Sequence, residues 1–223
     1  MTCSRRKFVL GMGSVVFFSA PLFSTLAGTE KGKAVRYAMI HDETLCNGCN
    51  LCVTACRKVN DVPEGMARMS IAHIPLTPPD QGNQYHFFRY ACQHCEEAPC
   101  ITVCPTGASY RDQATGIVRV NRPTCIGCSY CISACPYQVR YLNPVTHVAD
   151  KCDFCFESRL SKGFPPICVS ACPQQALLFG REDSEPIQRW LKTHDYYRYQ
   201  LPGAGEAHVY RRPGPHSAEE VKA

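Results

Sequence analysis

Closely spaced cysteines constrain this chain more than any other feature of its sequence. Residues 125–136 read C-I-G-C-S-Y-C-I-S-A-C-P, which is a C-x2-C-x2-C-x3-C-P run. Cysteine thiolates hold iron–sulfur clusters at this spacing: three wrap one cluster, and the fourth points away and ligates the other cluster of a pair. Gly127 leaves room for backbone N–H groups to approach the cluster. The motif therefore predicts partner motifs elsewhere in the chain.

Three further groups of four cysteines are present, and we number the groups as quartets one to four in chain order. Quartet one repeats the spacing over 46–56, and quartet two reads C-x2-C-x4-C-x3-C over 92–104. Quartet three is the run at 125–135, and quartet four reads C-x2-C-x12-C-x3-C over 152–172. Together they account for sixteen of the seventeen cysteines and leave only Cys3.

The first residues have the features of a twin-arginine export signal. Arg5 and Arg6 precede an apolar run over 9–23, and a small-residue cleavage site ending at Ala27 follows it. An uncleaved membrane anchor is the alternative, but the run is shorter than the roughly 20 residues that a span needs. The sequence therefore predicts a signal peptide over 1–27, and cleavage after Ala27 is left open.

Two other uses of the cysteines make different predictions. An even number of cysteines in an exported protein is typical of disulfides, and C-x2-C pairs also bind zinc. The twin-arginine route carries proteins that are already folded with their cofactors, which fits clusters inserted before export. Zinc does not explain the C-x2-C-x2-C-x3-C runs, because their fourth cysteine points elsewhere. Colour separates these alternatives, since a cluster protein is brown and a zinc protein is colourless.

Net charge gives no reason to expect nucleic acid as a partner. The formal charge is +5, from 24 basic and 19 acidic residues. Removal of residues 1–27 takes away three basic residues and no acid, which leaves 21 basic against 19 acidic, or +2. An oxidised four-iron cluster with four thiolates adds about −2, so four clusters would make the protein acidic.

The remaining pattern predicts an α+β fold with short elements. Strands and hairpins are expected over 35–41, 60–91, 107–120, 139–148 and 176–179. Helices are expected from Cys52 to about residue 59, because Arg57 follows quartet one where proline follows the others, and over 185–192. The chain beyond residue 201 is expected to be extended.

The symmetry of the quartets predicts two bacterial-ferredoxin-like units, the second nested within the first. Quartets two and three, separated by one hairpin, form an inner unit over 92–136. Quartets one and four close an outer unit over 35–91 and 137–182 around it. A C-terminal helix and an extended tail occupy 183–223.

The crossover of the fourth cysteine then predicts four ligand sets, one for each [4Fe–4S] cluster. Each set joins three cysteines of one quartet to the last cysteine of its partner quartet. The sets are Cys46, Cys49, Cys52 and Cys172 (set one); Cys92, Cys95, Cys100 and Cys135 (set two); Cys125, Cys128, Cys131 and Cys104 (set three); and Cys152, Cys155, Cys168 and Cys56 (set four).

Apart from the clusters, the sequence indicates no catalytic site. A cubane that keeps four cysteine ligands has no open iron, so it passes single electrons and carries out no bond chemistry. No C-x-x-C is followed by histidine, as c-type haem attachment requires, and no glycine-rich dinucleotide fingerprint is present. His94 is expected beside a cluster or at the surface, because four thiolates already complete the ligand set. The sequence predicts an electron-transfer subunit and not an enzyme in its own right.

The linkers around the quartets resemble those of one known family. They are similar to the iron–sulfur electron-transfer subunits of the DMSO, polysulfide and nitrate reductase type. Within that family the chain most resembles the iron–sulfur subunit of the formate-dependent (cytochrome c) nitrite reductase system. The resemblance covers nearly the whole chain and rests on the quartets, on Arg57, and on the stretches V-R-Y (35–37), V-P-E-G (62–65), C-P-T-G-A-S (104–109) and A-D-K-C-D-F-C (149–155).

The resemblance implies a periplasmic protein that is exported in folded form and is peripheral to the membrane through a partner. That partner is a polytopic subunit that oxidises quinol. Electrons then pass through four [4Fe–4S] clusters to a multihaem c-type cytochrome that reduces nitrite. The alternative is the same role feeding a molybdopterin reductase of the tetrathionate, polysulfide or DMSO type, because the clusters do not determine the acceptor.

Overall fold

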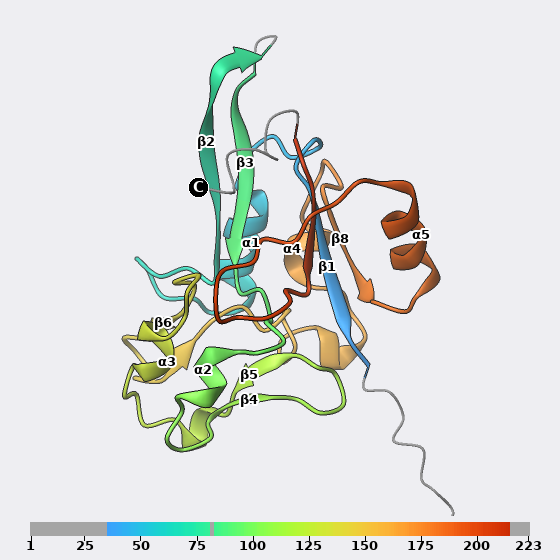
Figure 1. The fold of residues 1–223 in the computed structure, drawn as a ribbon. Helices are drawn as coiled ribbons and strands as arrows, with labels where there is room; N and C mark the ends of the chain where they lie inside the picture. The colour runs from blue at the N-terminus through green and yellow to red at the C-terminus, as the bar shows by residue number, and fades with distance from the viewer. Residues whose placement is uncertain (1–34, 81–82, 215–223) are drawn as a thin grey trace, which may run out of the picture. The chain divides into compact units, whose positions relative to one another are not determined.

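The computed structural model describes residues 35–80 and 83–214, drawn in colour in Figure 1. The predicted signal peptide over 1–27 and Cys3 lie outside these residues. The described chain combines short helices with short strands, as predicted, and none of its helices is long and apolar enough to span a bilayer. The strands are β1 (Tyr37–Asp42), β2 (Met69–Asp80), β3 (Asn83–Ala91), β4 (Ser109–Arg111), β5 (Val118–Val120), β6 (Tyr141–Leu142), β7 (Ala149–Asp150), β8 (Leu177–Arg181) and β9 (Val209–Arg212). The α-helices are α1 (Leu51–Val59), α2 (Pro99–Thr102), α3 (Tyr130–Ser133), α4 (Ile167–Ser170) and α5 (Glu185–Thr193).

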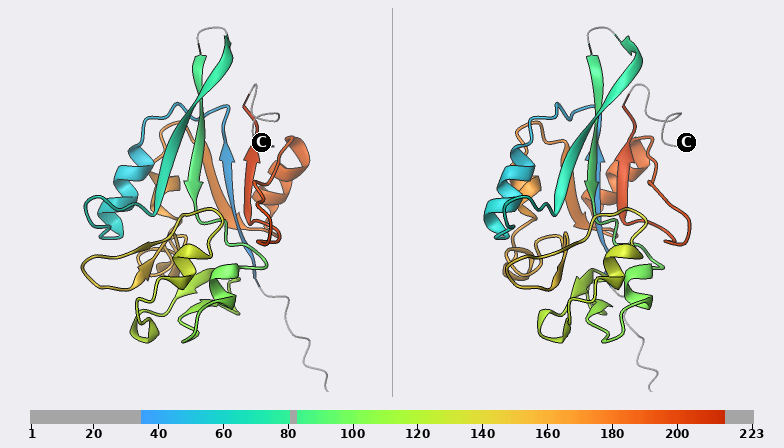
Figure 2. Two further views of the ribbon diagram at one scale, coloured as in Figure 1. Left: turned by 60° about the vertical axis from the view of Figure 1, so that its left-hand side comes forward. Right: turned by 90° about the vertical axis from the view of Figure 1, so that its left-hand side faces the viewer.

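β1 is the central strand of a three-stranded sheet. It pairs antiparallel with β8, with Tyr37 opposite Arg181, and parallel with β9. Side chains alternate across a sheet, so Met39 joins the core that contains cysteines, whereas Ile40 packs with Ile187 of α5. Accordingly, α1 and α5 lie on opposite sides of this sheet (Figure 1 and Figure 2).

Proline determines the length of the helices that carry the cysteines. Quartets two, three and four end in Cys-Pro, and α2, α3 and α4 have four residues each, because proline and the residue before it disfavour helical geometry. Quartet one ends in Cys56-Arg57, and α1 continues to Val59, as predicted. The helices pack in pairs, α1 against α4 and α2 against α3. This packing brings quartet one beside quartet four and quartet two beside quartet three.

Hairpins occupy the predicted linkers, with one difference in length. β4 pairs with β5 between quartets two and three, and β6 pairs with β7 between quartets three and four. β2 continues to Asp80 and β3 begins at Asn83, so the hairpin includes residues where the prolines predicted a loop. Each strand of a two-stranded hairpin has one unpaired edge, which tolerates a residue without an N–H. The register also shifts between Pro75 and Asp80, and the strands run side by side beyond the shift (Figure 2).

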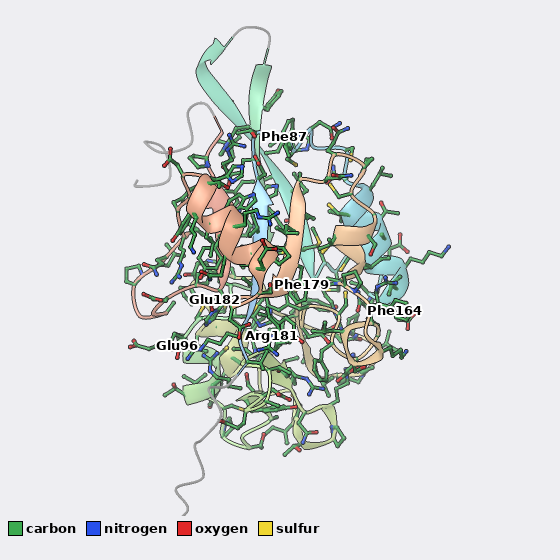
Figure 3. All side chains as sticks on the ribbon, turned by 90° about the vertical axis from the view of Figure 1, so that its right-hand side faces the viewer. Phe87, Glu96, Phe164, Phe179, Arg181 and Glu182 are labelled. Carbon is green, nitrogen blue, oxygen red and sulfur yellow. The ribbon has the colours of Figure 1, made fainter. Side chains whose placement is uncertain are left out.

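Phe179 of β8 connects the sheet to the cysteine core. Its ring stacks on Tyr37 with 5.2 Å between centroids, and it meets the ring of Phe154 at 5.1 Å. Phe154 lies between Cys152 and Cys155, so the sheet supports the backbone of quartet four directly. Figure 3 labels Phe179 among the side chains of the fold.

The sequence did not indicate β9. It predicts only an extended tail beyond residue 201, whereas Val209–Arg212 form a strand in register with Met39–Asp42 of β1. Val209 and Tyr210 are buried at 0% and 1% exposure. A parallel pair needs a long crossover, and this strand has four residues and a partner near the start of the fold. No local pattern predicts such a pairing.

Replacing Ile187 with alanine tests the support that α5 gives to the sheet. Ile187 is 1% exposed and packs with Ile40 and Tyr210. Because truncation in a core leaves a cavity, we expect the free energy of unfolding to fall by about 2–5 kcal/mol. Urea unfolding followed by the fluorescence of Trp190 measures the change. Lys192→Ala, an exposed change on the same helix, is the control, and equal stability of the two variants would contradict the packing.

Candidate metal centres

All sixteen cysteines of the quartets lie among the described residues, and each has a free thiol. No disulfide joins any two cysteines within 35–80 and 83–214. The quartets are therefore available as metal ligands, and the question is which thiols lie together.

Set one surrounds a small cavity. Its walls are formed by Cys46, Cys49, Cys52 and Cys172, together with His41, Ile71 and Leu177. The pKa of the Cys46 thiol is raised to about 11, first by burial and further by the other three thiols of the set. The loop before α1, α1 itself and the turn after α4 thus direct four sulfurs into one space.

Set three surrounds a second small cavity, whose walls include Cys104, Cys125, Cys128 and Cys131. Burial raises the pKa of the Cys104 thiol, but hydrogen bonds outweigh burial and the net shift is downward. The main contributor is the N–H of Ser109, which donates to Cys104 Sγ at 3.3 Å. Such a bond favours the thiolate, which is the form that binds metal.

In sets two and four, thiols of the same set are close enough to raise the pKa of another member. The pKa of Cys95 is raised to about 12, first by burial and then by Cys92, Cys100 and Cys135. The pKa of Cys56 is raised first by burial and then by Cys152, Cys155 and Cys168. The structure thus brings the four members of every predicted set near one another.

The geometry fits a group larger than one metal ion. A tetrahedral zinc site holds its sulfurs about 2.3 Å from the metal, but across the described residues no three His, Cys, Asp or Glu side chains lie close enough for one ion. Thiols spread around a cavity suit a four-iron cube, in which each sulfur binds a different iron. Burial opposes free thiolates, and the positive charge of bound iron compensates for it. The sites therefore fit 4Fe–4S clusters.

One backbone conformation recurs in all four quartets. The residue before the second cysteine has a positive φ in each case: 70° at Gly48, 51° at His94, 70° at Gly127 and 55° at Phe154. This conformation turns the chain around the thiols, and glycine adopts it without steric cost. Space also excludes a side chain at Gly127, because a Cβ there would lie 2.5 Å from the carbonyl oxygen of His147.

His94 and Phe154 adopt this conformation without being glycine, and they contact each other. Their rings stack with 3.8 Å between centroids. The Nδ1 of His94 accepts a hydrogen bond from the N–H of Val118 at 3.1 Å, and burial holds the pKa of His94 well below its usual value. The contact offsets the strain of two left-handed residues. The contact also joins the loop of quartet two to the loop of quartet four. His94 thus lies beside the cluster sites, which is one of the two positions predicted for it.

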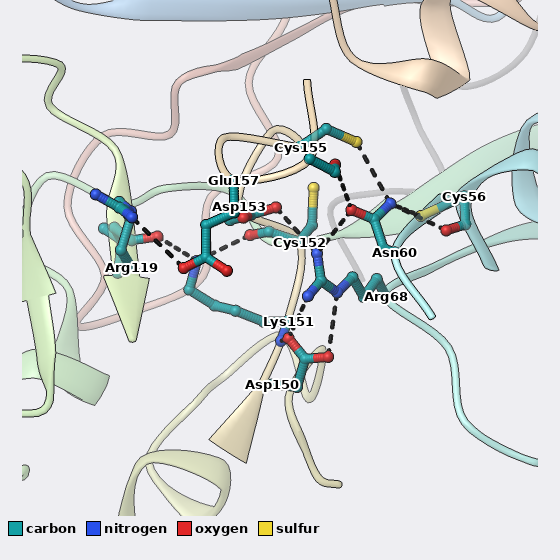
Figure 4. Close-up of polar contacts among 12 residues, drawn as sticks. Cys56, Asn60, Arg68, Arg119, Asp150, Lys151, Cys152, Asp153, Cys155 and Glu157 are labelled. Carbon is teal, nitrogen blue, oxygen red and sulfur yellow. Dashed lines mark hydrogen bonds and ion pairs between the residues drawn. The ribbon is translucent and has the colours of Figure 1, made fainter. Parts of the chain in front are cut away.

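Asn60 presents its amide nitrogen to a sulfur of set four. Its Nδ2 lies 3.5 Å from Cys155 Sγ. Arg68 fixes the orientation of the amide by donating to Asn60 Oδ1 at 3.1 Å, and ion pairs with Asp150 and Asp153 hold Arg68 in place (Figure 4). Hydrogen bonds to the sulfurs tune the potential of an iron–sulfur cluster.

Sequence reasoning did not find these polar side chains. Asn60 and Arg68 lie in a linker, and single polar residues there have no spacing that marks them. The same is true of two buried arginines, Arg89 and Arg140. Lys151 had one usable signal, because it directly precedes a cysteine within the A-D-K-C-D-F-C stretch.

Comparison with known proteins agrees with these sites. Residues 83–182 match the 4Fe–4S dicluster domain family, and residues 43–60 match a 4Fe–4S binding domain. The chain is 69% identical over 216 residues to the ferredoxin-like protein YdhX of Escherichia coli (strain K12), with 97% of both chains covered. It is 48% identical over 215 residues to protein NrfC of the same organism, with 96% of both covered. It is 51% identical over 192 residues to the thiosulfate reductase electron transfer subunit PhsB of Salmonella typhi, with 84% of this chain and 97% of PhsB covered.

The fold and the thiol sets define a ferredoxin-like protein that binds 4Fe–4S clusters. The chain belongs to the family of iron–sulfur electron-transfer subunits of reductase complexes. The family predicted from the sequence is thereby confirmed, as is a role in electron transfer.

Replacing Cys172 with serine tests the predicted crossover of ligands. Because Cys172 lies against the cavity of set one, we expect the change to alter the cluster of quartet one and to spare that of quartet four. EPR spectra of the reduced protein should then show the same altered signal in Cys172→Ser and Cys49→Ser, and a different one in Cys168→Ser. A Cys172→Ser spectrum matching that of Cys168→Ser would contradict the crossover.

Replacing Gly127 with alanine tests the close approach of the backbone at set three. Both Gly127→Ala and its control Gly65→Ala bear the strain of a left-handed alanine, about 1 kcal/mol. Only the first also clashes, because a Cβ at Gly65 has no neighbour within 4 Å. We expect Gly127→Ala to lose about one cluster in four by iron analysis. Full iron content in this variant would show that the site has room for a side chain.

Proposed function

We propose that this chain is a periplasmic electron-transfer subunit with four [4Fe–4S] clusters. It takes electrons from a polytopic membrane subunit that oxidises quinol and delivers them to a multihaem c-type cytochrome for nitrite reduction. The observation that carries the proposal is the presence of four thiol sets, two of which reach the surface. The acceptor rests on the resemblance to the iron–sulfur subunit of the nitrite reductase system, and the location rests on the twin-arginine export signal that the sequence predicts over 1–27.

The nested arrangement of two ferredoxin-like units is part of the proposal. The strands before quartet one and after quartet four, β1 and β8, pair antiparallel, and α1 packs against α4. These contacts support one outer unit over 35–91 and 137–182. The packing of α2 against α3, with the β4–β5 hairpin between their quartets, supports an inner unit over 92–136. Within 183–214, β9 adds a strand to the outer sheet and α5 packs against that sheet.

The exposure of the cysteines supports a linear order of the four thiol sets along the path of the electrons. Among the described cysteines, Cys49 of set one and Cys128 of set three are the exposed ones, whereas every thiol of set four is buried and set two has no exposed member. The stacked rings of His94 and Phe154 join sets two and four. The order is therefore one, four, two, three. When bound, each cluster supplies a reversible one-electron centre.

Large exposed apolar side chains flank both exposed cysteines in the sequence. Leu45 and Leu51, on either side of Cys49 in the sequence, are 48% and 51% exposed. Ile126 and Tyr130, on either side of Cys128, are 68% and 62% exposed. Exposed apolar side chains close to a cluster site suit contact with another protein, which supports one redox partner at each end of the order.

A second candidate acceptor is a molybdopterin reductase of the tetrathionate, polysulfide or DMSO type. The 51% identity to a thiosulfate reductase electron transfer subunit favours this alternative. Both candidates use the same four thiol sets and the same membrane donor, so the acceptor has to be identified by its own cofactor.

Purification of the tagged full-length protein with its partners, from anaerobically grown cells, tests the acceptor. We expect a brown complex that contains iron, acid-labile sulfide and c-type haem but no molybdenum. Molybdenum without haem would replace the cytochrome with a pterin-dependent reductase and leave the electron-transfer role intact. Zinc in a colourless protein would reject the cluster proposal. Quinol-dependent nitrite reduction at wild-type rate in a deletion strain would reject the role in nitrite reduction.

A further inference from the structure

Three basic side chains are buried beside the cysteines without a carboxylate partner. Arg89, Arg140 and Lys151 are 0%, 5% and 2% exposed. Among the side chains that the structure describes, in 35–75 and 85–214, none of the three forms an ion pair with Asp or Glu, whereas the equally buried Arg68 and Arg211 do. Burying an unpaired cation is costly. An anion of another kind must therefore lie near each of the three.

Arg89, on β3, lies between set one and set four. Its Nη2 is 3.9 Å from Cys152 Sγ, and its Nε and Nη1 have no hydrogen-bond partner. Burial lowers the pKa of Arg89, but nearby thiolates outweigh burial and the net shift is upward. Those thiolates belong to Cys168, Cys152, Cys52 and Cys56. Cys52 is a member of set one and the others are members of set four. Ile71, which lies opposite Arg89 in the β2–β3 hairpin, forms part of the wall of the set-one cavity, so Arg89 lies near both sets.

Arg140 has the corresponding place between set two and set three. It forms part of the wall around the cavity of set three, and its Nη2 donates to Ser109 Oγ at 2.9 Å. Its Nε and Nη1 have no hydrogen-bond partner. Burial lowers the pKa of Arg140, and Cys100 and Cys92 of set two together with Cys131 of set three raise it. The net shift is again upward.

Lys151 lies between set four and set two. It precedes Cys152 of set four, and its Nζ donates to the carbonyl oxygens of Cys152, at 2.8 Å, and of Val118. These uncharged acceptors hold the ammonium group in place without neutralising it. Burial raises the pKa of Cys100 in set two, and the charges of Arg140 and Lys151 oppose that shift. Val118 in turn donates its N–H to Nδ1 of His94, which lies between Cys92 and Cys95, so the ammonium group lies near both sets.

We propose that these three cations alternate with the four clusters, one in each gap of the order one, four, two, three, and raise the reduction potentials of the clusters beside them. The inference rests on the proposed function, because it takes the four thiol sets as cluster ligands. An added electron makes a cluster more negative, so a fixed positive charge nearby stabilises the reduced state more than the oxidised state. The effect is strong in a buried site of low dielectric.

An EPR-monitored redox titration of the anaerobically purified full-length holoprotein tests the proposal, with one charge removed at a time. We expect Arg89→Gln to lower two of the four midpoint potentials, Arg140→Gln to lower the other two, and Lys151→Met to lower one from each pair. At a fixed ambient potential, the ratio of reduced to oxidised cluster should fall about tenfold, which is about 59 mV for one electron.

The control is Arg189→Gln, which removes a charge from a side chain of α5 that is 71% exposed. We expect it to leave all four midpoints unchanged. Four unchanged midpoints in Arg89→Gln protein with full iron content would overturn the proposal. A uniform shift of all four midpoints in every variant would overturn it too. Wild-type protein without iron would instead reject the proposed function, before any variant is made.

Lysine variants separate charge from shape if a glutamine variant loses its iron. Arg89→Lys and Arg140→Lys keep the charge and change the side chain, so we expect full iron content and midpoints close to those of the wild type. Iron retained with lysine and lost with glutamine would support a requirement for charge. Iron lost with both, or lysine midpoints as low as those of glutamine, would overturn the electrostatic role.

Discussion

Burying sulfur together with its negative charge is the constraint on which the rest of this structure depends. Cys52, Cys56, Cys92, Cys152 and Cys168 belong to the main core cluster. Inorganic groups therefore stand where larger apolar side chains fill the core of an ordinary domain. Three of the helices around them have four residues each, which is too short for a helix to be stable alone. Bonds from sulfur to metal hold such elements in place, much as a structural metal staples a small domain.

The segment that carries quartet four contacts the segment around quartet two through residues next to cysteines. His94 of quartet two stacks on Phe154 of quartet four, and the ammonium group of Lys151 reaches the carbonyl oxygen of Val118. Both contacts are buried and make no use of a carboxylate. A change in the position of one loop is therefore transmitted directly to the other, because packed side chains leave little room for independent movement.

The sequence predicted the elements that cysteine spacing and proline control. The helix through Arg57, the hairpins between quartets and the strand before quartet one were all found from local pattern. The ligand sets were predicted by symmetry, and the structure places their members together. β9 and the buried cations were not predicted, for a common reason. The partner of Val209 lies near the start of the fold, and the charge that Arg89 faces comes from two distant quartets, so neither has a local signature.

The position of β1 in the sheet has a consequence for how the protein is made. β1 is synthesised before both of its neighbours, Leu177–Arg181 and Val209–Arg212. Until Cys172 and Leu177–Arg181 have left the ribosome, set one is incomplete and β1 has two unpaired edges. One edge stays unpaired until Val209–Arg212 follows. A truncated chain consequently exposes strand edges that invite aggregation. The sheet is therefore complete only when residues 209–212 have been added to the chain.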